Sequence, residues 1–171
     1  MRARLFSISL FAAAIPFFSS SRAGAFEREW HAGVDLGYAS LFGDHSAGGF
    51  GGGAHLVYGL SDTFDALLDV DFSHHAAANT DVMSSGLGIA YTLDVARIVP
   101  YAGLMVGGYR LTGDLPTTAP GAQIALGIDY QLDRHWAAGL QLRMHTIFAS
   151  DPVGTTVYGT TFLRFEYLWG F

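Results

Sequence analysis

The last 15 residues, 157–171 (VYGTTFLRFEYLWGF), alternate between two kinds of side chain. One series begins at Val157, is apolar or small, and becomes aromatic toward Phe171, whereas the other series contains Arg164 and Glu166. Successive side chains of a β-strand point to opposite faces, so this period of two predicts a strand with one apolar and one polar face. The segment is also longer than the roughly 9–11 residues that a strand needs to cross a membrane.

The same alternation occurs seven times upstream, which indicates an all-β protein. The eight alternating segments are 30–39, 50–59, 64–73, 85–93, 101–107, 122–131, 136–145 and 157–171. Their apolar series carries no charged residue, and the opposite series collects Gly, Asp, Gln, Arg and His. In segment 101–107 either series could face outward. We predict an eight-stranded antiparallel transmembrane up-and-down β-barrel with apolar side chains toward lipid and polar side chains toward the lumen.

The composition agrees with a protein that crosses a membrane by strands. Half of the 171 residues are hydrophobic, 14% are charged, and the chain has neither Lys nor Cys. After the first 25 residues, the longest stretch without Asp, Glu or Arg is 45–61, which contains six Gly and is shorter than the roughly 20 residues of a membrane helix. The formal net charge of −6 argues against a nucleic-acid partner, and the missing Cys exclude disulfides and thiolate zinc sites.

Residues 1–25 have the pattern of a cleaved secretory signal peptide. Arg2 and Arg4 precede an apolar stretch over 5–18, and Ala23-Gly24-Ala25 offers a cleavage site of small residues. An uncleaved anchor helix is the alternative, but its apolar run would be short for a bilayer. Cleavage would leave the barrel as residues 26–171, with six Arg against 15 acidic residues and a net charge of −9.

Aromatic residues of the apolar series gather at the two ends of the predicted strands. If the chain starts in the periplasm, the lower ends carry Trp30, Tyr58, Phe64, Tyr91, Tyr130, Trp136, Tyr167 and Trp169, and the upper ends carry Tyr38, Phe42, Phe50, Phe72 and Phe148. Two such belts are typical of the two water–lipid interfaces of a membrane barrel. The upper connections, roughly 43–48, 75–81, 112–120 and 149–154, are short for the outer side of such a barrel.

A soluble lipocalin-like barrel, with the apolar series inside, is the alternative to a membrane barrel. It would place the Gly-rich series in water, where Gly weakens strands without aiding solubility. It would also leave both aromatic belts unexplained and require a soluble surface without a single Lys. The pattern therefore favours the membrane barrel.

The end of the chain resembles the C-terminal assembly signal of bacterial outer-membrane barrels, a terminal aromatic residue preceded by alternating hydrophobic residues. Phe165, Tyr167, Trp169 and Phe171 match it position by position. Segment 94–109 is also similar to the small outer-membrane barrel family of OmpA/OmpX type. The resemblance implies location in the outer membrane and insertion by the barrel assembly machinery. We expect the peptidoglycan-binding domain of OmpA to be absent, because the sequence stops at the barrel.

Charged residues of the inner series fall at similar heights in the predicted barrel. We expect a polar network in the lumen that comprises Asp35, Asp69, Arg143 and Arg164, with Glu166 just below. An eight-stranded barrel is just wide enough to be filled by side chains. A structural plug is the favoured interpretation, and a narrow polar pore for small solutes is the alternative.

Histidines and serines near the outer rim raise the possibility of an enzyme. Some small outer-membrane barrels deacylate or acylate lipid A, and His74 with Ser84 or Ser85, oriented by Asp71 or Asp81, could form such a site. The His-x-Ser spacing of the deacylase family is missing, however. We also expect no metal site from His45, His74 and His75, which lie in or near outer loops, and structural roles for His31, His55 and His145 in the lumen.

The sequence therefore predicts a non-enzymatic, integral outer-membrane barrel with a structural or membrane-integrity role. The alternatives are a narrow pore and a lipid A-modifying enzyme at the outer-leaflet rim. We expect no cofactor, and we expect a monomer whose partners are outer-membrane lipid, lipopolysaccharide and, during insertion, the barrel assembly machinery.

Overall fold

Eight strands make up almost all of the structure, a computed structural model that describes residues 28–42, 46–94, 96–113, 116–149 and 155–170. The strands are β1 (Trp30–Phe42), β2 (Ala47–Gly59), β3 (Phe64–His75), β4 (Thr80–Thr92), β5 (Ile98–Gly113), β6 (Thr117–Gln131), β7 (Trp136–Phe148) and β8 (Thr155–Trp169). A single turn of 3-10 helix, η1 (Ala76–Ala78), joins β3 to β4. Among the described residues, no helix is both long and apolar enough to cross a membrane. The expected signal peptide, 1–25, and the terminal Phe171 lie outside the described residues.

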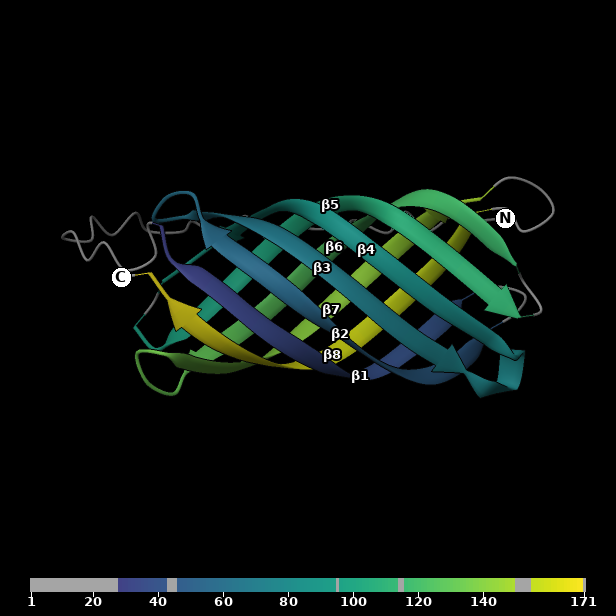
Figure 1. Ribbon diagram of the computed structural model, residues 1–171, viewed down its shortest axis with the longest axis horizontal. Coiled ribbons are helices and arrows are strands. Elements are labelled where there is room, and N and C mark those ends of the chain that lie inside the picture. Colours follow the sequence, from purple (N-terminus) through teal and green to yellow (C-terminus); the bar gives the residue numbers. More distant parts are fainter. Residues whose placement is uncertain (1–27, 43–45, 95, 114–115, 150–154, 171) are drawn as a thin grey trace, which may run out of the picture.

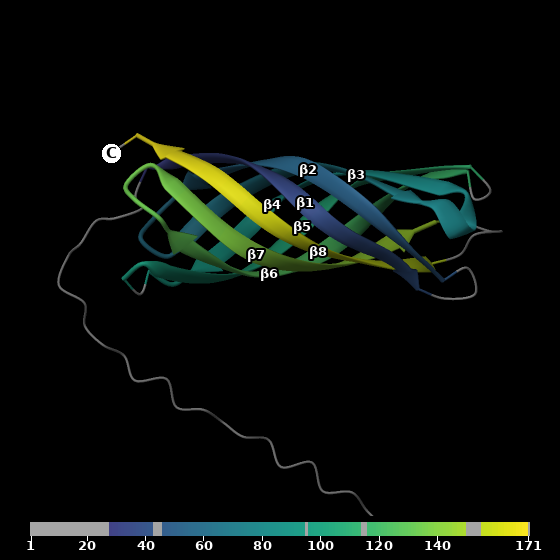
Figure 2. The ribbon, with the colours of Figure 1, turned by 90° about the horizontal axis from the view of Figure 1, so that it is seen from below.

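The strands form a closed barrel in which every neighbouring pair is antiparallel. The closing pair, β1 with β8, runs from Trp30 opposite Trp169 to Phe42 opposite Val157, and the two strands lie side by side in Figure 2. Among the described strands, closure thus leaves no edge strand. Figure 1 shows that the strands are tilted against the long axis of the barrel, as closure requires. The predicted eight-stranded antiparallel barrel is confirmed.

The two ends of the barrel differ, because the strands that carry the chain ends begin and finish at one of them. With an even number of strands, β1 starts and β8 ends at the same end, which we call the terminal end. The opposite end, where β1 joins β2 and β7 joins β8, is called the loop end. Two connections at the terminal end, 60–63 and 132–135, are tight turns in which a side chain accepts backbone hydrogen bonds. In one of them, Asp133 Oδ1 accepts hydrogen bonds from the backbone N–H groups of His135 (2.7 Å) and Trp136 (3.1 Å), as Asp does in many turns.

The outer surface carries the apolar series. Its aliphatic side chains are largely exposed, and the aromatic residues of both predicted belts also face outward, with Tyr58 half-buried beside Trp30. The strand whose orientation was open, β5, places Leu104 and Val106 outside and Tyr101 in the lumen. This is the surface that a lipid bilayer would cover.

The strands extend further at the loop end than their alternation indicated. The connections expected at roughly 75–81 and 112–120 lie where predicted but are shorter, because β4 already begins at Thr80, β5 continues to Gly113 and β6 begins at Thr117. Backbone pairing such as that of Thr80 with Gly113 continues the ladder past the apolar segments. Gly113 then turns the chain with a φ of +90°, and a Cβ there would lie 1.8 Å from the carbonyl oxygen of Asn79.

This extension changes the outward series at the loop end. Beyond the predicted segments, the outward positions include Asp81 and Arg110 together with His74. The expectation of an outer face without charge therefore holds for the segments from which it was inferred and is wrong for the loop end.

Candidate functional site: the ion network of the lumen

The lumen is divided into layers of different chemistry. Its loop-end part is a buried apolar layer, the loop-end plug, which comprises Ala39, Leu41, Val82, Tyr109, Leu111, Ala119, Ile147 and Tyr158. A smaller apolar cluster, Val99, Ala137 and Leu168, lies toward the terminal end. Charged groups of the inner series concentrate in the middle of the barrel, and mainly apolar groups fill its loop end.

Arg143 on β7 is the first centre of the charged network. Its guanidinium lies 2.5 Å from Asp71 Oδ2, 3.0 Å from Asp69 Oδ2 and 3.4 Å from Asp35 Oδ2. Its Nε donates a hydrogen bond to Gln141 Oε1 at 2.5 Å. Only 2% of the residue is exposed, so the guanidinium interacts with three carboxylates from β1 and β3 away from bulk water.

Arg164 on β8 is the second centre. Its Nη2 lies 2.5 Å from Glu166 Oε1, its Nε 3.5 Å from Asp35 Oδ1 and its Nη1 3.6 Å from Asp129 Oδ2. Nη1 also donates a hydrogen bond to the hydroxyl of Tyr101, and the guanidinium lies 5.1 Å from the centre of that ring. Since Asp35 contacts both arginines, the two centres form one network.

Two histidines extend the network toward the terminal end. His55 Nδ1 lies 2.9 Å from Asp35 Oδ2, and its Nε2 lies 3.0 Å from Glu166 Oε1. His31 Nδ1 lies 3.3 Å from Glu166 Oε2 and its Nε2 lies 3.8 Å from Glu29 Oε2. Each imidazole is thus placed between two carboxylates, so the network links β1, β2 and β8 across the seam that closes the barrel.

Glycines of the inner series make the space for these side chains. A Cβ at Gly53 would lie 2.1 Å from Asp71 Oδ1, and a Cβ at Gly139 would lie 1.8 Å from Asp129 Oδ1. A substituent at either position would thus displace a carboxylate. These glycines therefore relieve crowding in the lumen. A cavity of about 20 Å³ lies beside Tyr101 and Glu166.

Polar groups within the loop-end plug are joined by hydrogen bonds. The Ser73 hydroxyl lies 2.7 Å from the Tyr158 hydroxyl and 3.1 Å from His75 Nε2. Since His75 Nδ1 lies 3.1 Å from the Ala47 carbonyl oxygen, it donates there, and Nε2 of a neutral ring accepts the Ser73 proton. His75 is the last residue of β3, next to the connection at the loop end, and its side chain is fully buried in the lumen.

The structure brings all five residues of the expected lumen network together. Asp35, Asp69, Arg143, Arg164 and Glu166 are linked by the ion pairs described above. Sequence reasoning missed the participation of Asp71, His55, Asp129, Tyr101 and Gln141. Asp71, His55, Asp129 and Gln141 lie on the inner series, so their orientation was predictable, whereas the orientation of Tyr101 on β5 was open. The proximity of all five depends on the register and tilt of the strands.

The serine–histidine constellation of the alternative enzyme hypothesis is not assembled. His74 pairs with Asp81, 2.6 Å between Nδ1 and Oδ1, but Ser84 is buried on the inner face. Ser85 faces outward opposite Val70, four residues along β3 from His74, which corresponds to about 13 Å. His45, expected near an outer loop, lies outside the described residues. In the described part of the chain, no three His, Asp or Glu side chains are grouped so as to hold a metal ion.

Comparison with known proteins agrees with this architecture. Residues 9–168 match the outer membrane protein beta-barrel domain family, and the chain belongs to this family. The family and the similar structures point to the outer membrane. A search of curated proteins gave no match.

Several solved structures have the same barrel. Neisserial surface protein A is 18% identical, with 81% of this chain and 96% of that chain covered and a TM-score of 0.73. The N-terminal barrel of OprF from Pseudomonas aeruginosa is 13% identical, with 84% and 98% covered and a TM-score of 0.63. Ail of Yersinia pestis is 9% identical, with 84% and 100% covered and a TM-score of 0.61. At these identities the similarity concerns the fold.

Proposed function

We propose that this protein is a structural barrel of the outer membrane that supports membrane integrity and does not pass solutes. The observation that carries the proposal is the loop-end plug. Tyr109 and Tyr158 are almost fully buried in it, and their hydroxyls are satisfied across the lumen, by His145 Nδ1 at 2.9 Å and by Ser73 Oγ at 2.7 Å. Aromatic rings fixed in this way would close the lumen to hydrated solutes.

The ion network supports the same function. A narrow pore, the alternative, would require a continuous aqueous path past Arg143 and its three carboxylates. Separating a buried charge from its partners costs about 3–5 kcal/mol, so we expect the network to stay closed at rest. Its contacts join strands from all sides of the barrel, which suits a role in stiffening the protein.

We further propose that the protein has no enzymatic activity, that it is inserted by the barrel assembly machinery and that it is a monomer. The separation of Ser85 from His74 supports the first of these statements, since the catalytic pair that a lipid A-modifying enzyme would need is not formed. Mass spectrometry of lipid A from cells with and without the protein tests it. A lost or relocated acyl chain would show an acyl hydrolase or transferase.

The integrity role is tested in the bacterium that makes the protein. We expect deletion of its gene to increase uptake of a hydrophobic fluorescent dye, and expression of the wild-type protein to reverse the increase. Uptake of small hydrophilic solutes should be the same in both strains. Unchanged dye entry after deletion would refute the integrity role, and slower solute uptake after deletion would favour the pore.

A further inference from the structure

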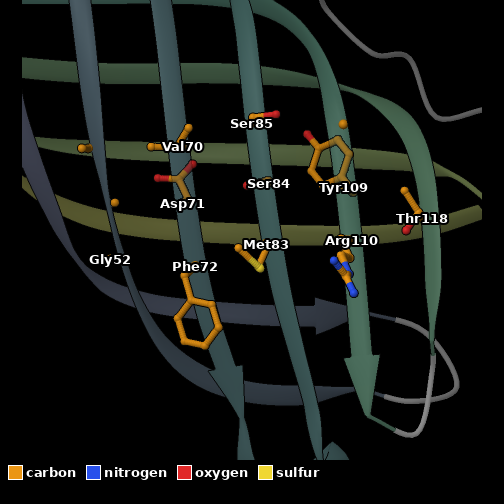
Figure 3. A pocket seen from close by; sticks show the side chains of 13 residues that line it. Gly52, Val70, Asp71, Phe72, Met83, Ser84, Ser85, Tyr109, Arg110 and Thr118 are labelled. Atoms are coloured by element: carbon orange, nitrogen blue, oxygen red, sulfur yellow. The ribbon is translucent and has the colours of Figure 1, made fainter.

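A groove on the outer surface of the barrel is formed by β2 to β6 in the half near the loop end. It has a volume of about 620 Å³ and is lined on its outer side mainly by apolar side chains. Figure 3 shows Phe72, Met83 and Arg110 beside one another on three adjacent strands, in agreement with the pairing of Met83 with both of the others. The small residues Gly52 and Gly108 form the low part of the groove.

Both glycines keep the groove open, for different reasons. At Gly52 a side chain has no room, since a Cβ would lie 2.7 Å from the carbonyl oxygen of Asp35. At Gly108 a side chain would have room, because the nearest atom to its Cβ would be Ser85 Oγ at 3.9 Å. A larger residue at 108 would therefore fill the groove without distorting the barrel, which makes this position useful for testing what the groove binds.

Arg110 gives the groove a positive charge. Among the described strands it is the one arginine on the outer face, since Arg143 and Arg164 point into the lumen. No carboxylate of the described residues forms an ion pair with it. Arg110 pairs with Met83 on β4, and Met83 pairs with Phe72 of the upper aromatic belt on β3. The guanidinium is thus placed near a water–lipid interface, where phosphate is the favourable partner for a planar, always charged group.

Polar groups around Arg110 suit a ligand with a sugar headgroup. The outward-facing side chains of Ser85 and Thr118 line the same groove and carry hydroxyls that both donate and accept hydrogen bonds. The nearest acidic side chain on the outer face of β4, Asp81, is engaged by His74 at 2.6 Å and by the Thr112 hydroxyl at 3.4 Å. The groove therefore combines an apolar trough, hydroxyls and an available cation at one end.

We propose that this groove binds a phosphorylated glycolipid of the outer leaflet, of the lipid A type, with an acyl chain in the trough and a phosphate on Arg110. The choice of an outer-leaflet lipid follows from the position of Arg110 near the loop end, which lies at the cell surface when both chain ends face the periplasm. Lipid binding in this groove does not require a closed lumen.

Native mass spectrometry of the detergent-solubilised, folded protein tests the proposal. The probes are bisphosphorylated lipid A, its dephosphorylated form and phosphatidylglycerol. Two variants target the groove, Arg110→Gln to remove the charge and Gly108→Leu to fill the trough. Two matched controls make the same kinds of change elsewhere, Arg97→Gln in a terminal-end turn and Ala102→Leu on the outer face outside the groove. Heat-dependent gel mobility verifies that every variant is folded.

We expect lipid A to remain bound to the wild-type protein and to both controls, and the dephosphorylated form to bind more weakly. Arg110→Gln should lower the apparent affinity for lipid A roughly tenfold or more, the effect of losing one charge-assisted contact, and Gly108→Leu should also lower it. The proposal is overturned by equal binding in all variants, by no bound lipid A, or by phosphatidylglycerol bound as tightly as lipid A. A dimer of this chain that Arg110→Gln dissociates would also overturn it, because the groove would then be an interface.

Discussion

Arg143 and Asp71 lie on opposite walls of the barrel, yet Arg143 Nη1 and Asp71 Oδ2 are 2.5 Å apart. Their strands, β7 and β3, are separated by four positions around a ring of eight. The ion pair therefore spans the full width of the lumen. A contact of this kind connects strands that share no backbone hydrogen bonds, which explains how the interior can contribute to the stability of a barrel whose neighbouring strands are already paired.

Replacing Arg143 with Met should strongly destabilise the protein. The change leaves three buried carboxylates, those of Asp35, Asp69 and Asp71, without their shared cation, and breaking a buried ion pair in this way costs about 3–5 kcal/mol. The free energy of unfolding is measured by urea titration in lipid vesicles, followed by tryptophan fluorescence. Arg97→Met, in an exposed turn, is the control and should change stability little. A similar small effect at Arg143 would mean that the network contributes little to folding.

The hydrogen bond between Tyr158 and Ser73 should contribute measurably to the loop-end plug. We expect Tyr158→Phe to reduce the free energy of unfolding by about 1 kcal/mol, because the Ser73 hydroxyl loses a buried partner. The double variant Tyr158→Phe/Ser73→Ala should be less destabilised than the sum of the two single variants. Strict additivity in this cycle would contradict the 2.7 Å contact between the two hydroxyls.

Two glycines should differ strongly in their response to the same substitution. Gly139→Ala places a Cβ 1.8 Å from Asp129 Oδ1 and 2.6 Å from the backbone oxygen of Ile128, so we expect a loss of about 1–3 kcal/mol from overpacking. Gly108→Ala has open space around its Cβ and should change stability by less than about 0.5 kcal/mol. Urea titration of the two variants side by side measures the difference, and equal stabilities would show that the lumen has more room than these distances allow.

The aromatic pair that covers the barrel seam should show coupling. Trp30 and Trp169 face each other across β1 and β8, with ring centres 6.4 Å apart and planes at 13°. A double-mutant cycle with Trp30→Ala and Trp169→Ala should give a coupling of about 0.5–1.5 kcal/mol, measured by circular dichroism during urea unfolding. Two independent, additive losses would mean that the rings contact lipid and not each other.

The fold could be predicted because the alternation of side chains is a local property. Each strand displays its outer and inner series within about ten residues, and the even number of segments predicts closure with both chain ends together. The loop end could not be predicted in this way, since the strands continue there through residues such as Thr80 and Thr117, which pair with neighbours that no single segment reveals.

The lumen was predicted in part for the same reason. Inward orientation follows from the alternation, and it placed Asp35, Asp69 and Arg143 correctly in the lumen. Most of the loop-end plug was missed, because residues such as Leu41 and Ile147 lie beyond the alternating segments, although they continue the inner series. The contact of Arg143 with Asp71 depends on strand tilt and register. These two properties determine the height of each residue in the barrel, and the sequence of a single strand does not reveal them.

The most direct test of the closed lumen is single-channel recording in a planar lipid bilayer. The purified wild-type protein should insert without conductance steps, whereas Tyr109→Ala/Tyr158→Ala, which removes both rings of the loop-end plug, should show brief or small steps. Regular conductance steps from the wild-type protein, altered by Arg143→Met, would contradict the closed lumen and identify the network as the lining of a pore.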